Sequence, residues 1–319
     1  MKNRKKWAAA ILLFVLGLVL AFFGFAGAGF SFENLGAQKI IENTLMPEGE
    51  FEDISVVVIA SDVLIAPSSD GATRIVCRET EKVKHYAHVS DNTLTIDAVD
   101  TREWFDRIGL NFNKTSVTVY LPENEYKNAF IKTTAGAITL SRNFSFANLR
   151  AQTTTGAVKA YSDASESLLL SVTTGSIDIK GVKTLKADVK TTTGSITAQD
   201  FAVSGDMTAT VTTGKIALSD VSAGSLSAKS TTGKLHLTGV DVSGDLTLET
   251  TTGDIDFEKT DAENAYLKTT TGDIRGEFLT KKQFSAKTST GSVRVPDTNS
   301  GGVCRAQSAT GDIEIGIQE

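Results

Sequence analysis

The amino-acid sequence predicts an all-β protein in which residues 127–319 form a parallel β-solenoid of ten stacked coils. A Thr-rich triplet that ends in glycine recurs ten times, successive glycines are always 19 or 20 residues apart, and apolar and polar residues alternate on both sides of each glycine. The glycines are Gly136, Gly156, Gly175, Gly194, Gly214, Gly233, Gly253, Gly272, Gly291 and Gly311. A fixed period of this length is typical of repeats that bury their apolar sides by stacking.

Two apolar columns run through all ten repeats. The residues two positions after the glycines are Ile138, Val158, Ile177, Ile196, Ile216, Leu235, Ile255, Ile274, Val293 and Ile313, and those five positions before are Ile131, Ala151, Leu170, Val189, Ala209, Ala228, Leu248, Leu267, Ala286 and Ala306. Alternation with period two indicates strands. We expect neighbouring coils to lie about 4.8 Å apart, with Ile177 in contact with Ile196.

Each repeated glycine is expected at a corner of the coil, in a backbone conformation that other residues rarely adopt. The threonines before it are expected to stack in rows from coil to coil. In-register stacking sets Asp256 beside Arg275, and Arg294 beside Glu314. The competing repeat folds fit less well. Leucine-rich repeats need a leucine framework, and propeller blades need 40 or more residues.

The N-terminus predicts a membrane anchor. Residues 7–30 contain no charged residue and follow Lys2, Arg4, Lys5 and Lys6. A helix of this length reaches about 36 Å and can cross a hydrocarbon core of about 30 Å. A cleaved signal peptide is the alternative, because residues 26–28 resemble a small-residue cleavage site. Either interpretation places the rest of the chain outside the cytoplasm; with an uncleaved anchor, the protein is a single-pass protein of the cell membrane.

Between anchor and array, residues 31–50 are interpreted as a polar stalk and residues 51–126 as an N-terminal β cap. The expected strands of the cap are 54–60, 63–66, 74–79, 85–90, 93–98 and 116–121. Large apolar residues at 104–112 are expected to fold over the cap, with a contact patch for a membrane or partner as the alternative. At the other end, the last coil is expected to leave an unpaired strand edge near Glu319.

Charge and cysteine content exclude several classes of protein. Because the first 30 residues hold four basic residues and no acid, the net charge of −6 becomes −10 for residues 31–319. Such an acidic body is poorly suited to nucleic acid. Cys77 and Cys304 are too few for a disulfide framework or a metal cluster.

The serial Thr-Thr-Gly-x-Ile motifs and the strand Thr115-Ser-Val-Thr-Val-Tyr-Leu-Pro122 carry a family resemblance. Together with Ser61-Asp-Val-Leu-Ile65 and Asn92-Thr-Leu-Thr-Ile-Asp97, they make residues 50–319 similar to the bacterial "putative adhesin" family of exported solenoid domains of unknown function. The resemblance implies binding at the cell surface. It supplies no catalytic residues.

Few residues suggest chemistry, and no catalytic residue, cofactor or metal ligand is assigned. His85 and His88 should face opposite sides of a strand and are expected to be exposed, and His236 stands alone on an outward column. Asp254 and Asp273 should come within about 5 Å of each other near Asp256. They could bind Ca²⁺ or act on sugars, but an ordinary solvated surface is the favoured interpretation.

The sequence therefore predicts a non-enzymatic, adhesin-like surface protein. Its expected partners are the membrane through residues 7–30, an unknown protein or cell-wall polymer, and a second copy through the C-terminal edge, with no nucleic acid. The alternatives are a carbohydrate-active solenoid enzyme, whose activity would need Asp254 and Asp273, and an accessory protein of envelope-stress signalling.

Overall fold

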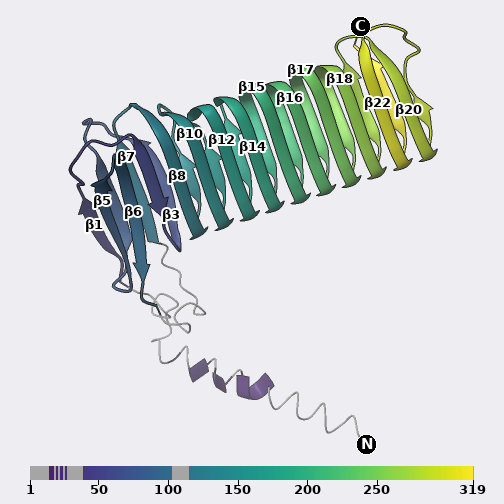
Figure 1. Ribbon diagram of the computed structural model, residues 1–319. Helices are drawn as coiled ribbons and strands as arrows, with labels where there is room; N and C mark the ends of the chain where they lie inside the picture. Colours follow the sequence, from purple (N-terminus) through teal and green to yellow (C-terminus); the bar gives the residue numbers. More distant parts are fainter. Residues whose placement is uncertain are drawn as a thin grey trace, which may run out of the picture.

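The computed structural model describes residues 14–17, 19–20, 22–23, 26, 39–102 and 115–318. From residue 39 onward these residues are almost entirely β-structure and form one long rod, with the last strands at the end opposite the first (Figure 1). Most of the predicted anchor at 7–30 and the whole apolar segment at 104–112 lie outside the described residues. Within the described part of the chain, no helix combines the length and apolarity needed to cross a membrane.

Ten coils, each marked by a repeated glycine, build most of the rod. Their strands are β8 (Glu125–Ala135), β9 (Ile138–Leu140), β10 (Ser145–Thr155), β11 (Val158–Ala160), β12 (Asp163–Thr174), β13 (Ile177–Lys180), β14 (Lys183–Thr193), β15 (Ile196–Thr213), β16 (Ile216–Thr232), β17 (Leu235–Thr252), β18 (Ile255–Thr271), β19 (Ile274–Phe278), β20 (Lys282–Thr290), β21 (Val293–Arg294), β22 (Gly302–Thr310) and β23 (Ile313–Ile317). Neighbouring coils pair in parallel, and Ile177 lies opposite Ile196. The predicted solenoid and its register are confirmed.

Each central coil has three straight segments separated by corners. In the coil of residues 196–214, the first corner is Asp200, which has a φ of 52°, and the second is a bulge before Asp206. Gly214 makes the third corner. The side chains that point inward are all buried, namely Ile196, Ala198, Phe201, Val203, Met207, Ala209 and Val211. Each such side chain contributes roughly 1–3 kcal/mol to stability, and together the coils form one continuous core.

The repeated glycine allows the coils to stack closely. Gly214 has a φ of 142°, and a Cβ built there would overlap the carbonyl oxygen of Gly194 in the preceding coil. Three residues before the glycine, a buried hydroxyl commonly donates a hydrogen bond to the preceding glycine's carbonyl. Examples are Thr191 to Gly175, at 2.9 Å, and Thr250 to Gly233, at 3.1 Å. The corner role expected of the glycine is confirmed.

The last two coils do not stack in sequence order. The strand β22 lies between β18 and β20 (Figure 1). In the same way, β23 lies between β19 and β21. Strand β22 is therefore enclosed on both sides, β23 is covered by β21 only at Ile313 and Glu314, and the ninth coil, β20–β21, forms the end of the rod. The expectation of an unpaired edge near Glu319 was wrong for β22, because the edge strand there is β20; within the described part of β23, only residues 315–317 have a strand partner on one side alone.

The charges of three exposed side chains agree better with this order than with simple succession. Sequence order would put Arg275 directly beside Arg294, whereas the observed order places Glu314 between them. The Arg294 guanidinium lies 2.6 Å from the Glu314 carboxylate. Like charges directly opposite each other destabilise neighbouring strands, and opposite charges stabilise them. The predicted neighbours Asp256 and Arg275, and Arg294 and Glu314, are both confirmed.

Two further parallel layers extend the array at its N-terminal end. Their strands are β2 (Asp53–Val57) and β3 (Ser61–Pro67), followed outward by β6 (Thr93–Asp100) and β7 (Thr115–Leu121). Three antiparallel strands then close the end, namely β4 (Arg74–Glu79) on β7, β5 (Val83–Ser90) on β6, and β1 (Ile41–Leu45) on β4. Residues 41–45 were predicted as part of a stalk, and this was wrong, because they pair along their whole length with β4.

Candidate functional site

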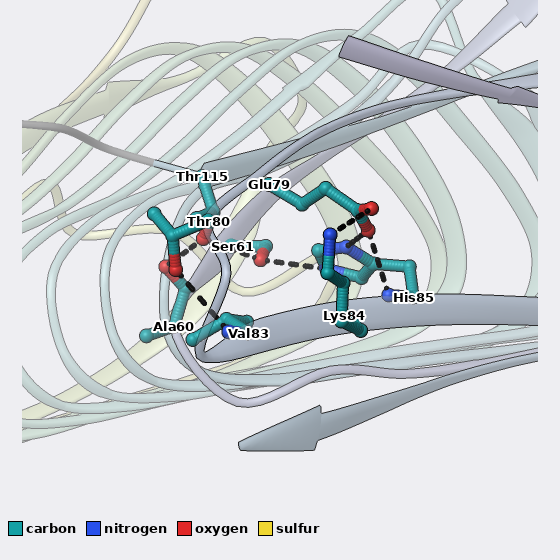
Figure 2. Close-up of polar contacts among 8 residues, drawn as sticks. All are labelled: Ala60, Ser61, Glu79, Thr80, Val83, Lys84, His85 and Thr115. Atoms are coloured by element: carbon teal, nitrogen blue, oxygen red, sulfur yellow. Dashed lines mark hydrogen bonds and ion pairs between the residues drawn. The ribbon is translucent and has the colours of Figure 1, made fainter. Parts of the chain in front are cut away.

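A buried polar cluster lies where β4 and β5 cover the N-terminal layers (Figure 2). The hydroxyl oxygen of Ser61 is 3.0 Å from Nε2 of His85, and Nδ1 of His85 is 3.3 Å from Oε2 of Glu79. The Lys84 ammonium lies 3.2 Å from the other Glu79 oxygen. Thr115 completes the cluster, with its hydroxyl 2.7 Å from that of Ser61. The order of serine, histidine and carboxylate resembles that of a hydrolase triad.

The environment of this cluster does not support nucleophilic catalysis. Ser61 has no exposed surface, and His85 is 2% exposed. In this arrangement no substrate carbonyl can approach the Ser61 hydroxyl, which is enclosed by His85 and Thr115. Burial lowers the pKa of His85, and the Glu79 carboxylate partly opposes this shift. A neutral His85 that donates from Nδ1 to Glu79 and accepts at Nε2 from Ser61 satisfies both ring nitrogens.

Sequence reasoning missed this cluster. It expected His85 on the surface, and this was wrong because β5 turns that residue toward the core; His88, three residues on, is exposed as expected. The segment Ser61-Asp-Val-Leu-Ile could have indicated that Ser61 lies in the stacked array, because it matches the repeat with serine in place of glycine. In the structure, Ser61 occupies the glycine column, because Val63 pairs with Ile138 as the coils do.

Two of the three aspartates near the C-terminal end, Asp254 and Asp273, bind backbone amides, and the third, Asp256, forms an ion pair. Oδ1 of Asp254 accepts a hydrogen bond from the Asp273 amide at 3.0 Å, and Asp273 in turn accepts one from Asp312 at 2.7 Å. Asp256 forms an ion pair with Lys234, and Asp273 forms one with Arg275. The expected proximity of Asp254 and Asp273 is confirmed. Their oxygens are used in joining successive coils, and the described residues contain no cluster of three or more metal-ligating side chains.

An open groove of about 680 Å³ lies over the outward side of the last coils. His236, Asp256, Arg275, Glu314 and Arg294 line it in stacking order. Its charges alternate in sign, so they largely neutralise one another. This groove therefore has no strong preference for an anion or a cation.

A different surface has a strong charge bias. We define the lysine–threonine face as the outward side chains one, two, four and six positions before each repeated glycine. Threonine dominates the two rows nearest the corner, and the row four positions before contains Lys132, Lys190, Lys229, Lys268 and Lys287, all exposed. Only Lys229 has an acidic partner among the described residues, with its ammonium 3.1 Å from Glu249. This face extends along all ten coils.

Comparison with known proteins places these observations in a family. The profile of a family described as Toastrack DUF4097 matches residues 51–238 and 195–319. Among solved structures, a putative adhesin from Parabacteroides distasonis ATCC 8503 is 15% identical, with 88% of this chain and 98% of that chain covered and a TM-score of 0.46. A putative adhesin from Parabacteroides merdae ATCC 43184 is also 15% identical, covers 77% and 98%, and has a TM-score of 0.48.

A third solved structure, a putative lipid binding protein from Parabacteroides distasonis ATCC 8503, is 13% identical, covers 89% of this chain and 98% of its own, and has a TM-score of 0.33. No curated protein matches this sequence.

Proposed function

The chain belongs to the Toastrack DUF4097 family, and from that premise we propose that it is a non-enzymatic binding protein on the outer side of the cell membrane. In this proposal residues 7–30 anchor the chain in the membrane, and the rod projects from it. The uncharged stretch of 24 residues behind a basic tip supports this orientation. The rod itself acts as a ligand-binding surface rather than as a scaffold for an active site.

The lysine–threonine face is the observation that carries this proposal. This face repeats the same few side-chain types in register across ten coils and faces outward. The polar groups of the buried cluster, in contrast, are hydrogen-bonded to one another and are not available to a ligand. A repeating surface suits a ligand that is held at many equivalent points, because weak contacts add when they are made together.

The rod end is a weaker candidate for the binding surface than its side. Strand addition or self-association would use the free edge of β20, but Lys282 of this strand points inward and lies 2.7 Å from Asp261. Inward-pointing charges on edge strands are a common device against edge-to-edge pairing. The returning segment also contacts the strand, through a hydrogen bond from the Thr298 hydroxyl to the Lys282 carbonyl.

Cysteine labelling in intact cells tests the location. The native Cys77 and Cys304 are fully buried, and burial raises the pKa of each thiol to about 12, so both should be silent toward a membrane-impermeant maleimide. We expect Thr231→Cys, on the exposed face, to be labelled in intact cells, and Lys5→Cys to be labelled only after lysis. Labelling of Thr231→Cys only after lysis would overturn the proposal.

A further inference from the structure

We propose that the lysine–threonine face binds an extended anionic polymer that carries a phosphate or carboxylate in each repeating unit and lies along the rod axis. The inference names the ligand class of the proposed function and rests on it. Its starting point is the uneven distribution of charge over the molecule. The argument then follows from the spacing, the hydrogen-bonding groups and the flatness of this face.

The face is basic although the protein is acidic. Its seven basic residues are Lys132, Arg150, Lys190, Lys229, Lys268, Lys287 and Arg305, and its two acids are Asp188 and Glu249. The face therefore carries a net charge of +5, while residues 31–319 together carry −10, which leaves −15 for the remaining surface. A concentrated positive field on an acidic protein attracts anions to that face and repels them from the others.

From Lys190 to the end of the rod, the observed stacking order spaces the lysines evenly. Along the rod, the row four positions before the glycines runs Lys190, Thr210, Lys229, Glu249, Lys268, Gln307 and Lys287. Lysine thus occupies every second layer, a repeat of about 9.6 Å when layers are about 4.8 Å apart. Simple succession of the coils would have placed Lys268 and Lys287 in adjacent layers. The exchange of the last two coils is what extends the regular spacing to the end of the rod.

Hydroxyl groups accompany the lysines. The exposed positions one and two residues before each glycine are threonine in most coils, such as Thr212 and Thr213 or Thr231 and Thr232. The corner and the extended strand hold them in parallel rows. Anionic oxygens accept hydrogen bonds from hydroxyl groups and charge-assisted bonds from lysine ammonium groups. The face therefore offers donors along its whole length.

The chemistry of the face favours a polymer over a protein or a nucleic acid. Protein interfaces are enriched in aromatic residues and depleted in lysine and serine, and single-stranded nucleic acids are held largely by stacking on aromatic rings. Here Tyr266 exposes 37% of its surface, and Phe130 lies under the Arg150 guanidinium, 5.5 Å from the ring centre. A flexible polyanion needs neither a pocket nor stacking. It needs regularly placed cations.

Binding of poly(glycerol phosphate) to the purified full-length protein in detergent tests the inference. The face variant combines Lys190→Gln, Lys229→Gln, Lys268→Gln and Lys287→Gln. We expect it to weaken binding at least tenfold at low salt. If each lysine neutralises one phosphate of a flexible chain, the slope of log affinity against log salt should fall in magnitude by about 3.

A matched control changes the same charge elsewhere. It combines Lys159→Gln, Lys180→Gln, Lys183→Gln and Lys215→Gln, which are exposed residues on the other faces, and should bind like the unaltered protein. Glu249→Gln removes the acid that interrupts the row of lysines and should strengthen binding. Because a gain of binding cannot result from unfolding, this variant separates the effect of charge from an effect on stability.

Three results would overturn the inference: equal losses in the face and control variants, equally tight binding of single-stranded oligo(dT), or equally tight binding of uncharged dextran. Absence of polymer binding in a protein whose Thr231→Cys variant is labelled on intact cells would reject this inference alone. Polymer binding by a protein that is labelled only after lysis would instead reject the proposed location.

Discussion

A single missing side chain decides how closely two coils can approach. At Gly214 a Cβ would overlap the carbonyl oxygen of Gly194, and the φ of 142° is one that other residues rarely adopt. The position three residues earlier is more tolerant: Thr191 and Thr250 donate to a glycine carbonyl there, whereas Val211 fills the same position without a hydroxyl. The glycine is thus required by geometry, and the buried threonine adds about 1 kcal/mol.

The buried His85 makes stability depend on pH. Its pKa in the folded protein is lowered from 6.5, chiefly by burial, so the unfolded chain binds a proton more readily than the folded one. As the pH falls below about 6.5, the free energy of unfolding should therefore decrease, until the pH reaches the folded pKa. Above this window the neutral ring is retained in both states, and its contribution to stability is complete.

The variant His85→Gln should show a weaker loss of stability on acidification, because its side chain does not titrate. Denaturant midpoints of the full-length protein at about pH 7.5 and about pH 5 measure this, on either side of the ordinary histidine pKa. His88→Gln, which changes an exposed histidine, is the control and should behave like the unaltered protein. An unchanged midpoint difference in His85→Gln would show that a group other than His85 governs the effect.

At the scale of elements, the exchange of the last two coils depends on a close passage of the backbone. The segment that enters β22 contains Gly301 and Gly302, and a Cβ at either would overlap a backbone carbonyl, that of Lys281 or of Glu263. The chain can therefore pass between the eighth and ninth coils only where side chains are absent. Once inserted, Glu314 separates two arginines, so topology and charge favour the same order.

Engineered disulfides can distinguish the two stacking orders. Neighbouring layers are about 4.8 Å apart, within the Cα separation that a disulfide spans, whereas alternate layers are about 9.6 Å apart. Arg275→Cys combined with Glu314→Cys should crosslink under mild oxidation. Arg275→Cys combined with Arg294→Cys should not. Electrophoretic mobility after denaturation without reductant measures the result, and crosslinking of the second pair alone would show that the coils stack in sequence order.

At the scale of the whole molecule, the rod is a one-dimensional stack in which each coil contacts only its neighbours. Stability in such arrays is approximately a sum of repeat and interface terms. A chain that ends at residue 299 lacks β22 and β23, which are the partners of β20 and β21. Amide hydrogens of β20 should then exchange much faster, whereas those of β15 and β16, several layers away, should keep their protection.

Hydrogen exchange followed by mass spectrometry measures both regions in one experiment. Retained protection of β20 in the shortened chain would contradict the expectation, because it would mean that the ninth coil can stack directly on the eighth. Loss of protection throughout the array would contradict nearest-neighbour coupling instead.

The sequence alone determined the period, the inward columns, the register and the closeness of Asp254 to Asp273. These follow from local alternation and from copies of one unit, and stacking brings each position next to its equivalent. The role of the aspartates was not visible, because it depends on which backbone amide each carboxylate meets. The charges of Arg275, Arg294 and Glu314 also pointed to the exchanged order of the last two coils. The prediction assumed that coils stack in sequence order and did not take these charges into account.

Only the tertiary structure decided what lies at the two ends of the rod. At one end, the strands β4 and β5 pair antiparallel to the array and bury His85 beside Ser61 and Glu79. At the other end, the strand β22 of the final coil lies between β18 and β20. Within the array every layer meets a copy of itself, so the repeat specifies its own neighbours. At the two ends of the described rod this rule is not sufficient: β4 and β5 pair with strands that are not their copies, and the repeat alone does not specify which copies the final coil lies between.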